Sequence, residues 1–518
     1  MINYPSKLPQ RTYATTLKEQ LKELETDELV LRYAESRQQL SSERYRPVYH
    51  YVPPEGPTND PNGFCTWQGR YHLCFQQYPP EDKRQHWGHA VSEDLVYWTD
   101  LPTAIYPGIE DRCYSGAAVT EDDRVLACYQ GTEAGIMIAE SSDPLLLNWE
   151  KIPGCPVIPD NEEATHGDGD PYRFAGSCLW KGEKGYYCVT GSYRGERYVD
   201  SAPTPQLFFS DNLRDWTYRG LFVEGDIFTT AGEDCACPYF WPFGDKHILV
   251  FCSHQRGCQY LLGDWDEADG VFRAFAHDRF TFGTRNNGGT CAPSVIPDGK
   301  GGILVIHMLT HGLETDGWNG MMSLPARLSL GPDNTVLHEP VAALEKLRAD
   351  HQHISETALP ANTDVALEGV AGNAMEIIAR IDPKESREVC LEVLRSPDGE
   401  ETTSIRYLRN GGAIKTKEPD TWYDVITIDT CRTSLHPDVL ARPPENASFK
   451  LGDGEILELR IFVDTSILEI FVNNRRYMTV RVHPFREDSL GVTMRAQGKD
   501  AVLLSLDAWR MKSIWTEA

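Results

Sequence analysis

The stretch Ser-Glu-Asp-Leu-Val-Tyr-Trp at residues 92–98 recurs as Ser-Asp-Asn-Leu-Arg-Asp-Trp at residues 210–216. Looser copies end at Trp149 and, after Gly263-Asp264, at Trp265. The four tryptophans recur at intervals of roughly 50 to 70 residues, a length that can hold several strands. Between them, short apolar runs alternate with Gly, Pro, Asp and Asn turns, so the pattern predicts an all-β propeller of five or six blades. The alternative is coincidental turn motifs in a β-sandwich.

The regions on either side of the repeat have a different character. Residues 15–39 read as one helix with Leu17, Leu21, Leu24 and Leu31 close to one face. From about residue 368 longer alternating strands predict a separate β-sandwich, including a hairpin over residues 467–482 that turns at Asn473-Asn474.

These patterns divide the chain into four parts. We expect an N-terminal helical extension over residues 1–45, the propeller over 46–345, a polar linker over 346–367 and the sandwich over 368–518. The helical extension either packs on the propeller or forms the interface of a homo-oligomer.

Composition narrows the class of partner. The chain has 518 residues and a net charge of -27, from 50 basic and 77 acidic residues. Such a charge repels nucleic acid and anionic membranes, so neither is an expected partner. The 14 cysteines are scattered, many within apolar runs, which predicts reduced, buried thiols and a cytoplasmic protein. Residues 1–10 lack the apolar core of a signal peptide, and no run is long enough to span a bilayer.

Cys235-x-Cys237 is the one pattern that suggests a metal site. No matching His or Cys pair follows it at the spacing of a zinc site. We therefore expect no metal ion and no cofactor.

Three turn-rich segments hold candidate catalytic carboxylates. Asp60 lies in Asn-Asp-Pro-Asn-Gly at residues 59–63, which predicts a tight polar turn. Asp170 precedes a proline in the same way, and residues 232–238 read Gly-Glu-Asp-Cys-Ala-Cys-Pro. Propellers bind ligands where the first strands of the blades converge, so we expect catalytic side chains to come from different blades.

Carboxylates brought together from different blades would suit the cleavage of a glycosidic bond. Cleavage with retention needs a carboxylate nucleophile and a carboxylic acid about 5 Å apart. A third carboxylate can stabilise positive charge in the transition state. Each segment alone would also fit an ordinary solvated turn.

Several short motifs together resemble glycoside hydrolase family 32, the invertase, inulinase and levanase group. Asn59–Gly63 resembles the nucleophile motif of that family. The other similar segments are Tyr71–Gln76, Trp87–Ala90 with the repeat that follows it, Tyr114–Gly116, Asp170-Pro171, Trp318 with Ser323–Pro325, and Thr465–Val472.

The resemblance implies a five-bladed propeller followed by a β-sandwich, and a retaining double displacement on β-fructofuranosides. It implies that Asp60 is the nucleophile, forming a covalent fructosyl-enzyme, and that Asp170 binds fructose hydroxyls and stabilises the oxocarbenium-like transition state. The substrate would be sucrose or another fructose-containing oligosaccharide. The implied fructose-binding residues are Asn59, Gln76, Trp87, Tyr114, Ser115, Cys237 and Trp318.

The chain departs from the family pattern at two positions. Gly169 replaces the arginine that precedes the second aspartate, and Ala236 occupies the position of the acid/base glutamate. Alanine cannot donate a proton, and a general acid contributes about 10² to 10⁴-fold to the rate. We therefore expect impaired turnover of natural fructosides, and a gain of roughly a hundredfold or more on Ala236→Glu.

Three interpretations of Ala236 remain open at this point. The first is a deliberate substitution of the acid glutamate. The second is that Glu233 serves instead, although its spacing of three residues places it on the opposite face of a regular strand unless a bulge intervenes. The third is a natural fructan-binding protein without catalysis.

Other activities of the same fold also remain open. A fructosyltransferase, or an enzyme that forms difructose anhydrides, would share the first chemical step. An arabinose-specific propeller glycosidase fits the residue 59–63 motif less well.

Overall fold

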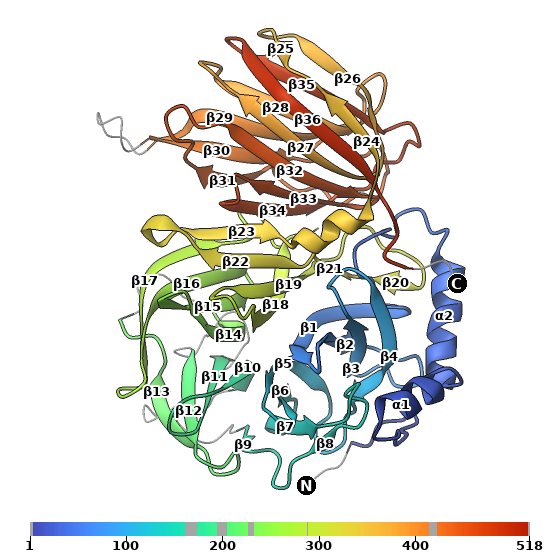
Figure 1. Ribbon diagram of the computed structural model, residues 1–518, viewed down its shortest axis with the longest axis vertical. Helices are drawn as coiled ribbons and strands as arrows, with labels where there is room; N and C mark the ends of the chain where they lie inside the picture. The colour runs from blue at the N-terminus through green and yellow to red at the C-terminus, as the bar shows by residue number, and fades with distance from the viewer. Residues whose placement is uncertain are drawn as a thin grey trace.

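The computed structural model describes residues 4–160, 173–193, 205–225, 233–286, 288–413 and 422–515. A ring of small sheets forms one half of the molecule and two larger sheets form the other, with two helices beside the ring (Figure 1). Among the described residues no helix has the length and apolar character needed to cross a membrane.

Five sheets of the described chain form the ring. The first holds β1 (Gly56–Trp67), β2 (Arg70–Gln77), β3 (His86–Ser92) and β4 (Trp98–Ile105), with β20 (Trp318–Asn319) beside β1. The second holds β5 (Cys113–Thr120), β6 (Val125–Gly131), β7 (Gly135–Ser141) and β8 (Glu150–Lys151), with β9 (Ile158–Pro159) beside β7. The third holds β10 (Arg173–Lys181), β11 (Tyr186–Tyr193), β12 (Gln206–Ser210) and β13 (Thr217–Leu221).

The remaining two sheets complete the ring. The fourth holds β14 (Ala236–Phe243), β15 (Lys246–Ser253), β16 (Gly257–Asp266) and β17 (Val271–Arg279). The fifth holds β18 (Thr290–Pro297), β19 (Ile303–Leu309), β22 (Ala326–Leu330) and β23 (Val336–Pro340), with β21 (Met321–Met322) beside β19.

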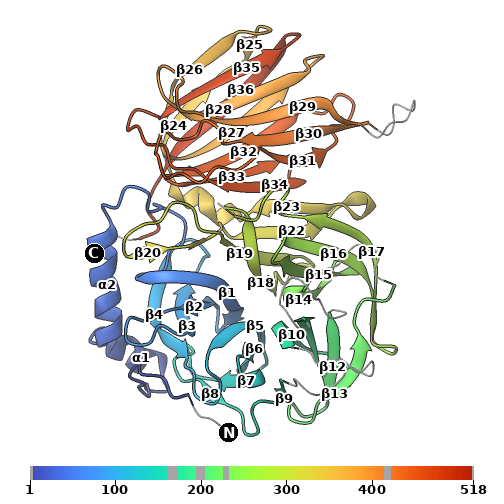
Figure 2. The same cartoon turned by 180° about the vertical axis from the view of Figure 1, so that it is seen from behind.

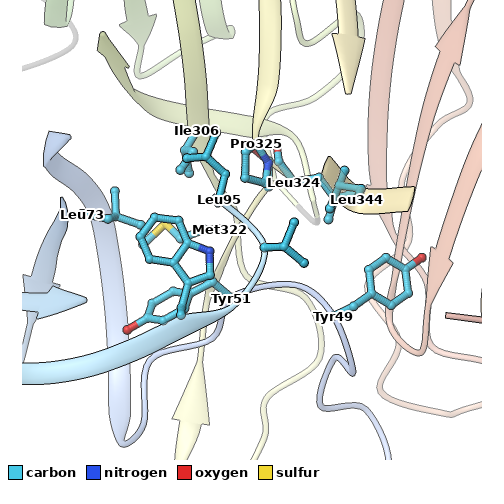
Figure 3. Close-up of a pocket in the computed structure, with 12 residues that line it drawn as sticks. Tyr49, Tyr51, Leu73, Leu95, Ile306, Met322, Leu324, Pro325 and Leu344 are labelled. Carbon is cyan, nitrogen blue, oxygen red and sulfur yellow. Dashed lines mark hydrogen bonds between the residues drawn. The ribbon is translucent and has the colours of Figure 1, made fainter. Parts of the chain in front are cut away.

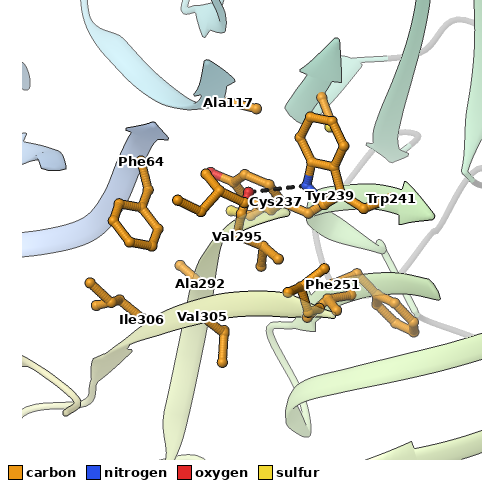
Figure 4. Close-up of a cluster of buried hydrophobic side chains, with 14 of the residues drawn as sticks. Phe64, Ala117, Cys237, Tyr239, Trp241, Phe251, Ala292, Val295, Val305 and Ile306 are labelled. Carbon is orange, nitrogen blue, oxygen red and sulfur yellow. Dashed lines mark hydrogen bonds between the residues drawn. The ribbon is translucent and has the colours of Figure 1, made fainter. Parts of the chain in front are cut away.

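The first strand of each sheet lies at the centre of the ring. β1 contacts β5, β5 contacts β10, β10 contacts β14, β14 contacts β18, and β18 contacts β1. This closed order confirms the predicted propeller (Figure 2). Consecutive sheets pack through apolar side chains such as Phe64, Tyr239 and Val295, and the indole Nε1 of Trp241 donates to the Val295 carbonyl at 3.0 Å (Figure 4).

The repeated fragment is a side-chain-capped turn before an outer strand. Ser92 Oγ accepts from the backbone N–H groups of residues 94 and 95, and Asp94 Oδ1 accepts from those of residues 96 and 97. Ser210 and Asn212 make the corresponding contacts before β13. Trp265, in contrast, lies inside β16, so it ends no such turn and the predicted fourth copy is wrong.

The first and last sheets meet at an apolar seam. β20 pairs in parallel with β1, Gly56 opposite Trp318, so a segment from the fifth sheet's part of the chain joins the first sheet. Beside this seam lies a closed cavity of about 10 Å³, lined by side chains such as Leu73, Ile306 and Met322 (Figure 3). The cavity is apolar and far too small for a sugar, so it belongs to the core.

The second half of the molecule is the predicted sandwich. One sheet holds β24 (Arg348–Ile354), β25 (Thr357–Leu359), β27 (Ala374–Asp382), β32 (Leu457–Asp464), β33 (Ile467–Val472), β34 (Arg476–Arg481) and β36 (Ala501–Met511). The other holds β26 (Asp364–Ala371), β28 (Glu388–Arg395), β29 (Thr403–Ala413), β30 (Trp422–Asp429), β31 (Glu445–Phe449) and β35 (Gly491–Gln497). Apolar side chains between the two sheets form a separate core.

The predicted linker over residues 346–367 is wrong. A short 3₁₀ helix, Ala342–Leu347, follows the propeller, and β24, β25 and the start of β26 occupy the rest of this segment. The residues of β24 are polar because the strand lies at a sheet edge and is largely exposed, which hid it in the sequence.

The predicted single helix is two helices, α1 (Leu17–Leu24) and α2 (Glu28–Leu40). Asp27 separates them because its carboxylate accepts the N–H groups of residues 29 and 30 and caps α2. The predicted leucine face is also wrong, since Leu21 is 51% exposed and Leu31 is 53% exposed. Gln20 is buried instead, and its amide donates to Asp143 of the second sheet's turn. The extension therefore packs on the propeller.

A buried ionic cluster joins the propeller's entry segment to the sandwich. His50 Nδ1 lies 2.8 Å from Asp464 Oδ2, and its Nε2 lies 3.1 Å from Glu469 Oε1. Asp464 also accepts the backbone N–H groups of residues 48, 49 and 50 at 2.7 to 2.9 Å. All three side chains are fully buried, so the contact fixes the two halves to each other.

Candidate active site

A cavity of about 490 Å³ opens at one end of the central ring. Each of the five sheets contributes to its lining through its first strand: Asp60 from β1, Ser115 from β5, Gly176 from β10, Ala236 from β14 and Cys291 from β18. The predicted convergence of residues remote in sequence is therefore present. Of the predicted site residues, the cavity is lined by Asn59, Asp60, Gln76, Tyr114, Ser115, Ala236 and Cys237.

Asp60 lies on an irregular strand and not on the tight turn that the sequence predicts. Residues 56–67 all belong to β1, but the pairing with β2 is interrupted between Thr58 and Pro61 and again between Asn62 and Cys65. Proline has no N–H for the ladder, and Gly63 has a φ of +51°. These interruptions redirect side chains locally, so a strand carries the carboxylate to the cavity.

Three neighbours contact one oxygen of the Asp60 carboxylate. The Ser115 hydroxyl and the Gln76 amide, at 3.2 Å, both donate to Oδ2. The Cys237 thiol donates to the same oxygen at 3.6 Å, and Gln76 also donates to Ser115 at 2.9 Å. Side chains from β2, β5 and β14 therefore fix the orientation of this carboxylate on β1.

Asn59 and Trp87 occupy supporting positions. The Asn59 amide donates to the Tyr78 hydroxyl at 2.6 Å. Trp87 is fully buried beneath the cavity and donates from Nε1 to the carbonyl of Tyr114 at 2.9 Å. A Cβ at Gly63 would lie only 2.7 Å from the Trp87 ring, so glycine allows the indole to pack under β1. Trp87 thus positions the strand that carries Tyr114 and is not part of the lining.

Trp318 lies at the seam between the first and last sheets and does not line the cavity. It is 2% exposed, and its Nε1 donates to Glu43 Oε2 at 2.9 Å. The guanidinium groups of Arg46 and Arg481 lie 5.5 and 5.8 Å from its ring centroid. These cationic and acidic partners from the entry segment and the sandwich enclose the indole.

Of the remaining predicted carboxylates, only Glu233 lies within the described residues, and it does not line the cavity. Glu233 is 4% exposed, and its Oε2 accepts from Arg256 at 2.8 Å and from Gln259 at 3.3 Å. Asp170 and Gly169 lie outside the described residues. At Ala236 the lining shows only a methyl group.

Sequence reasoning missed a histidine on the same side of the cavity. His254 lines the cavity, and its Nδ1 lies 2.6 Å from Asp234 Oδ2. The register of β14 and β15 places Ala236 opposite Cys252, and continuing this register places Asp234 opposite His254. The available signal was Asp234, which lies in the same Glu-Asp-Cys-Ala-Cys-Pro stretch as Ala236.

The thiols near the cavity are protonated at neutral pH. Burial raises the pKa of Cys237 well above its usual value, and the negative charge of Asp60 raises it further. All 14 cysteines lie within the described residues, all are free, and only Cys431 is exposed.

Iodoacetamide should therefore alkylate Cys431 first and leave Cys237 and Cys291 unmodified in the folded protein, because thiolates react and buried thiols do not. Peptide mass spectrometry after brief treatment at neutral pH checks this, with urea-unfolded protein as the control in which all sites react. Preferential labelling of Cys237 would instead reveal an activated thiolate.

The comparisons with known proteins agree with this geometry. The family model described as the N-terminal domain of glycosyl hydrolases family 32 matches residues 50–340, and the C-terminal model matches residues 343–510. The chain belongs to glycosyl hydrolase family 32. The resemblance drawn from the sequence motifs is thereby confirmed.

Family 32 relatives cover most of this chain. It is 26% identical to a levanase of Bacillus subtilis (strain 168), over 91% of this chain and 71% of the levanase. It is 28% identical to a sucrose-6-phosphate hydrolase of Escherichia coli, over 86% of this chain and 90% of that protein. The structure of fructan 1-exohydrolase IIa from Cichorium intybus has the same fold, with a TM-score of 0.76 at 21% identity over 91% of this chain and 98% of that one.

Proposed function

We propose that this protein is a retaining β-fructofuranosidase that releases terminal fructose from sucrose or short fructo-oligosaccharides. The observation that carries the proposal is Asp60, a carboxylate held by Gln76, Ser115 and Cys237 in a cavity that all five sheets line. The names of the family 32 relatives, which include levanase, raffinose invertase and sucrose-6-phosphate hydrolase, support fructosides as the substrate class.

In the proposed reaction Asp60 attacks the anomeric C2 of fructose. A bond forms between a carboxylate oxygen and C2, and the bond from C2 to the leaving oxygen breaks. Water then attacks C2 of the fructosyl-enzyme and releases Asp60, so configuration is retained. Asp170 is proposed to bind fructose hydroxyls and to stabilise the positively charged transition state. Position 236 contributes no carboxylic acid to either step.

Fructosyl fluoride tests the nucleophile independently of any acid, because fluoride leaves without much protonation. Acid quenching during turnover should trap one fructosyl group on the peptide that contains Asp60, detected by mass spectrometry. The matched control is Asp211→Asn, an exposed aspartate in a turn of the third sheet, which should label normally. Absence of any adduct on this peptide, with slow fluoride release, would contradict the proposal.

Two of the alternative functions give different results in the same experiment. A fructosyltransferase would also form the adduct but would give fructosylated sugars when the products are analysed in excess sucrose. A fructan-binding protein, which Ala236 favours over an ordinary hydrolase, would bind fructo-oligosaccharides and form no adduct.

A further inference from the structure

The side of the cavity that holds Ala236 also holds a histidine-carboxylate pair. His254 Nδ1 lies 2.6 Å from Asp234 Oδ2, and the backbone N–H of His254 lies 3.4 Å from the other oxygen of the same carboxylate. Asp234 is 1% exposed, whereas the His254 side chain is 21% exposed and lines the cavity. A buried carboxylate therefore holds an imidazole whose ring reaches the substrate space.

The strand register explains why this ring lies near position 236. Ala236 begins β14 opposite Cys252 of β15, Asp234 lies two residues before β14, and His254 directly follows β15. Ala236 and His254 both line the cavity, as does Asp60. Position 236 and the imidazole thus lie close together in the lining of the cavity that also holds Asp60.

Three other titratable groups of this region are poorer candidates for the proton donor. Burial lowers the pKa of His311, and the charges of Arg481 and Arg285 lower it further, so this ring is neutral. The Cys237 thiol already donates its hydrogen bond to Asp60. Glu233 does not line the cavity and is paired with Arg256.

We propose that His254, positioned by Asp234, is the acid/base catalyst of this enzyme in place of the absent glutamate. The inference rests on the proposed function. In the first step the C2–O bond breaks, its electron pair goes to the leaving oxygen, and His254 gives that oxygen its Nε2 proton while Asp60 bonds to C2. In the second step the neutral ring takes a proton from water as the water oxygen attacks C2 and Asp60 leaves.

This role of His254 replaces the sequence-based expectation of an impaired enzyme. Asp234 acts as a positioning residue, because its carboxylate contacts Nδ1 and so fixes the orientation of a ring that lines the cavity. The chain then has a working proton donor without a carboxylic acid at position 236.

The test compares substrates with different leaving groups. His254→Gln should lower kcat on sucrose by about 10² to 10⁴-fold. In the same variant, the fluoride burst from fructosyl fluoride should stay within about threefold of that of the native chain, because fluoride needs little protonation to leave. Asp234→Asn should also lose kcat on sucrose, by a smaller factor, while its fluoride burst stays nearly unchanged. The control is His247→Gln, because His247 lies within β15, the strand that ends just before His254, and does not line the cavity.

Variants at position 236 give an independent readout. If His254 already donates the proton, Ala236→Glu alone raises activity on sucrose by less than about tenfold, and the same substitution restores at least about a hundredfold to His254→Gln. A larger gain in the single variant overturns the proposal, because the native chain would then lack a donor. Equal losses of His254→Gln on sucrose and on fructosyl fluoride also overturn it.

The dependence of kcat on pH distinguishes a catalytic role of His254 from a purely structural one. When kcat on sucrose is plotted against pH, the His254→Gln variant should lose one limb of the profile. The His247→Gln variant should keep that limb. The described charged or titratable groups near the ring are Asp234, which contacts it, the pair of Arg256 and Glu233 next to these residues in the chain, and Asp60, Tyr114, Cys237, Arg285, Cys291 and His311 in the shared cavity. A misfolded His254→Gln is recognised by loss of fructosyl labelling at Asp60, and Asp234→Asn then decides the outcome. Failure of labelling in the native chain rejects the proposed function itself and not only the role of His254.

Discussion

The Asp60→Asn variant is expected to lose at least about 10⁴-fold in kcat/KM on sucrose, because it removes the proposed nucleophile. Asparagine has nearly the same shape as aspartate, so the side chain can still meet Gln76 and Ser115 while losing its charge. Initial rates of fructose release give the measurement.

The loss in this variant should hold for every leaving group. Fructosyl fluoride turnover should fall as far as sucrose turnover, unlike the split expected for a proton donor. The exposed Asp211→Asn variant should keep its activity, and circular dichroism should show native sheet content in both variants. Activity of Asp60→Asn within tenfold of the native chain would place the nucleophile elsewhere.

The Asp464→Asn variant is expected to lower the free energy of unfolding by about 3 to 5 kcal/mol, because it breaks a buried ionic cluster. Asp464 accepts three backbone N–H groups from residues 48–50 and contacts His50. An amide can present only one oxygen to these donors, and its NH₂ group faces N–H groups.

Urea unfolding followed by tryptophan fluorescence measures this change. The exposed loop variant Asp453→Asn is the matched control and should stay within about 0.5 kcal/mol of the native chain. A loss below about 1 kcal/mol for Asp464→Asn would mean that the cluster contributes little to joining the two halves.

The same cluster makes stability depend on pH. Burial alone would lower the pKa of His50, but hydrogen bonds with Asp464 and Glu469 outweigh burial and raise it to about 9. Protonated His50 therefore stabilises the fold fully below about pH 6.5, the ordinary pKa of the unfolded chain, and this contribution of about 3 kcal/mol is lost as pH rises toward 9. Urea unfolding across this range should show the decline, and His50→Gln should remove this component.

Local patterns were sufficient to predict the propeller and the sandwich. The repeated turn could be identified because Ser and Asp side chains cap it through contacts within a few residues. The position of Asp60 in the cavity followed from the expectation that first strands converge. Such features depend on neighbours in sequence or on a repeated fold, and both leave a visible pattern.

Features that depend on tertiary contacts could not be predicted from the sequence. Trp318 lies in the seam because Glu43 and two arginines enclose it, and no local pattern reports those partners. β24 is polar because it lies at an edge. His254 became visible as a site residue only through the register of β14 with β15, which brings it opposite Asp234.

The parallel pairing of Gly56 with Trp318 has a consequence for biosynthesis. The strand that bears residue 60 gains its second neighbour, β20, only after residue 318 has left the ribosome, and its entry segment gains Asp464 later still. Contacts so distant along the chain form slowly. A nascent chain that stops short of these residues would hold the strand of the proposed nucleophile without these partners, so the surroundings of this strand are completed only late in translation.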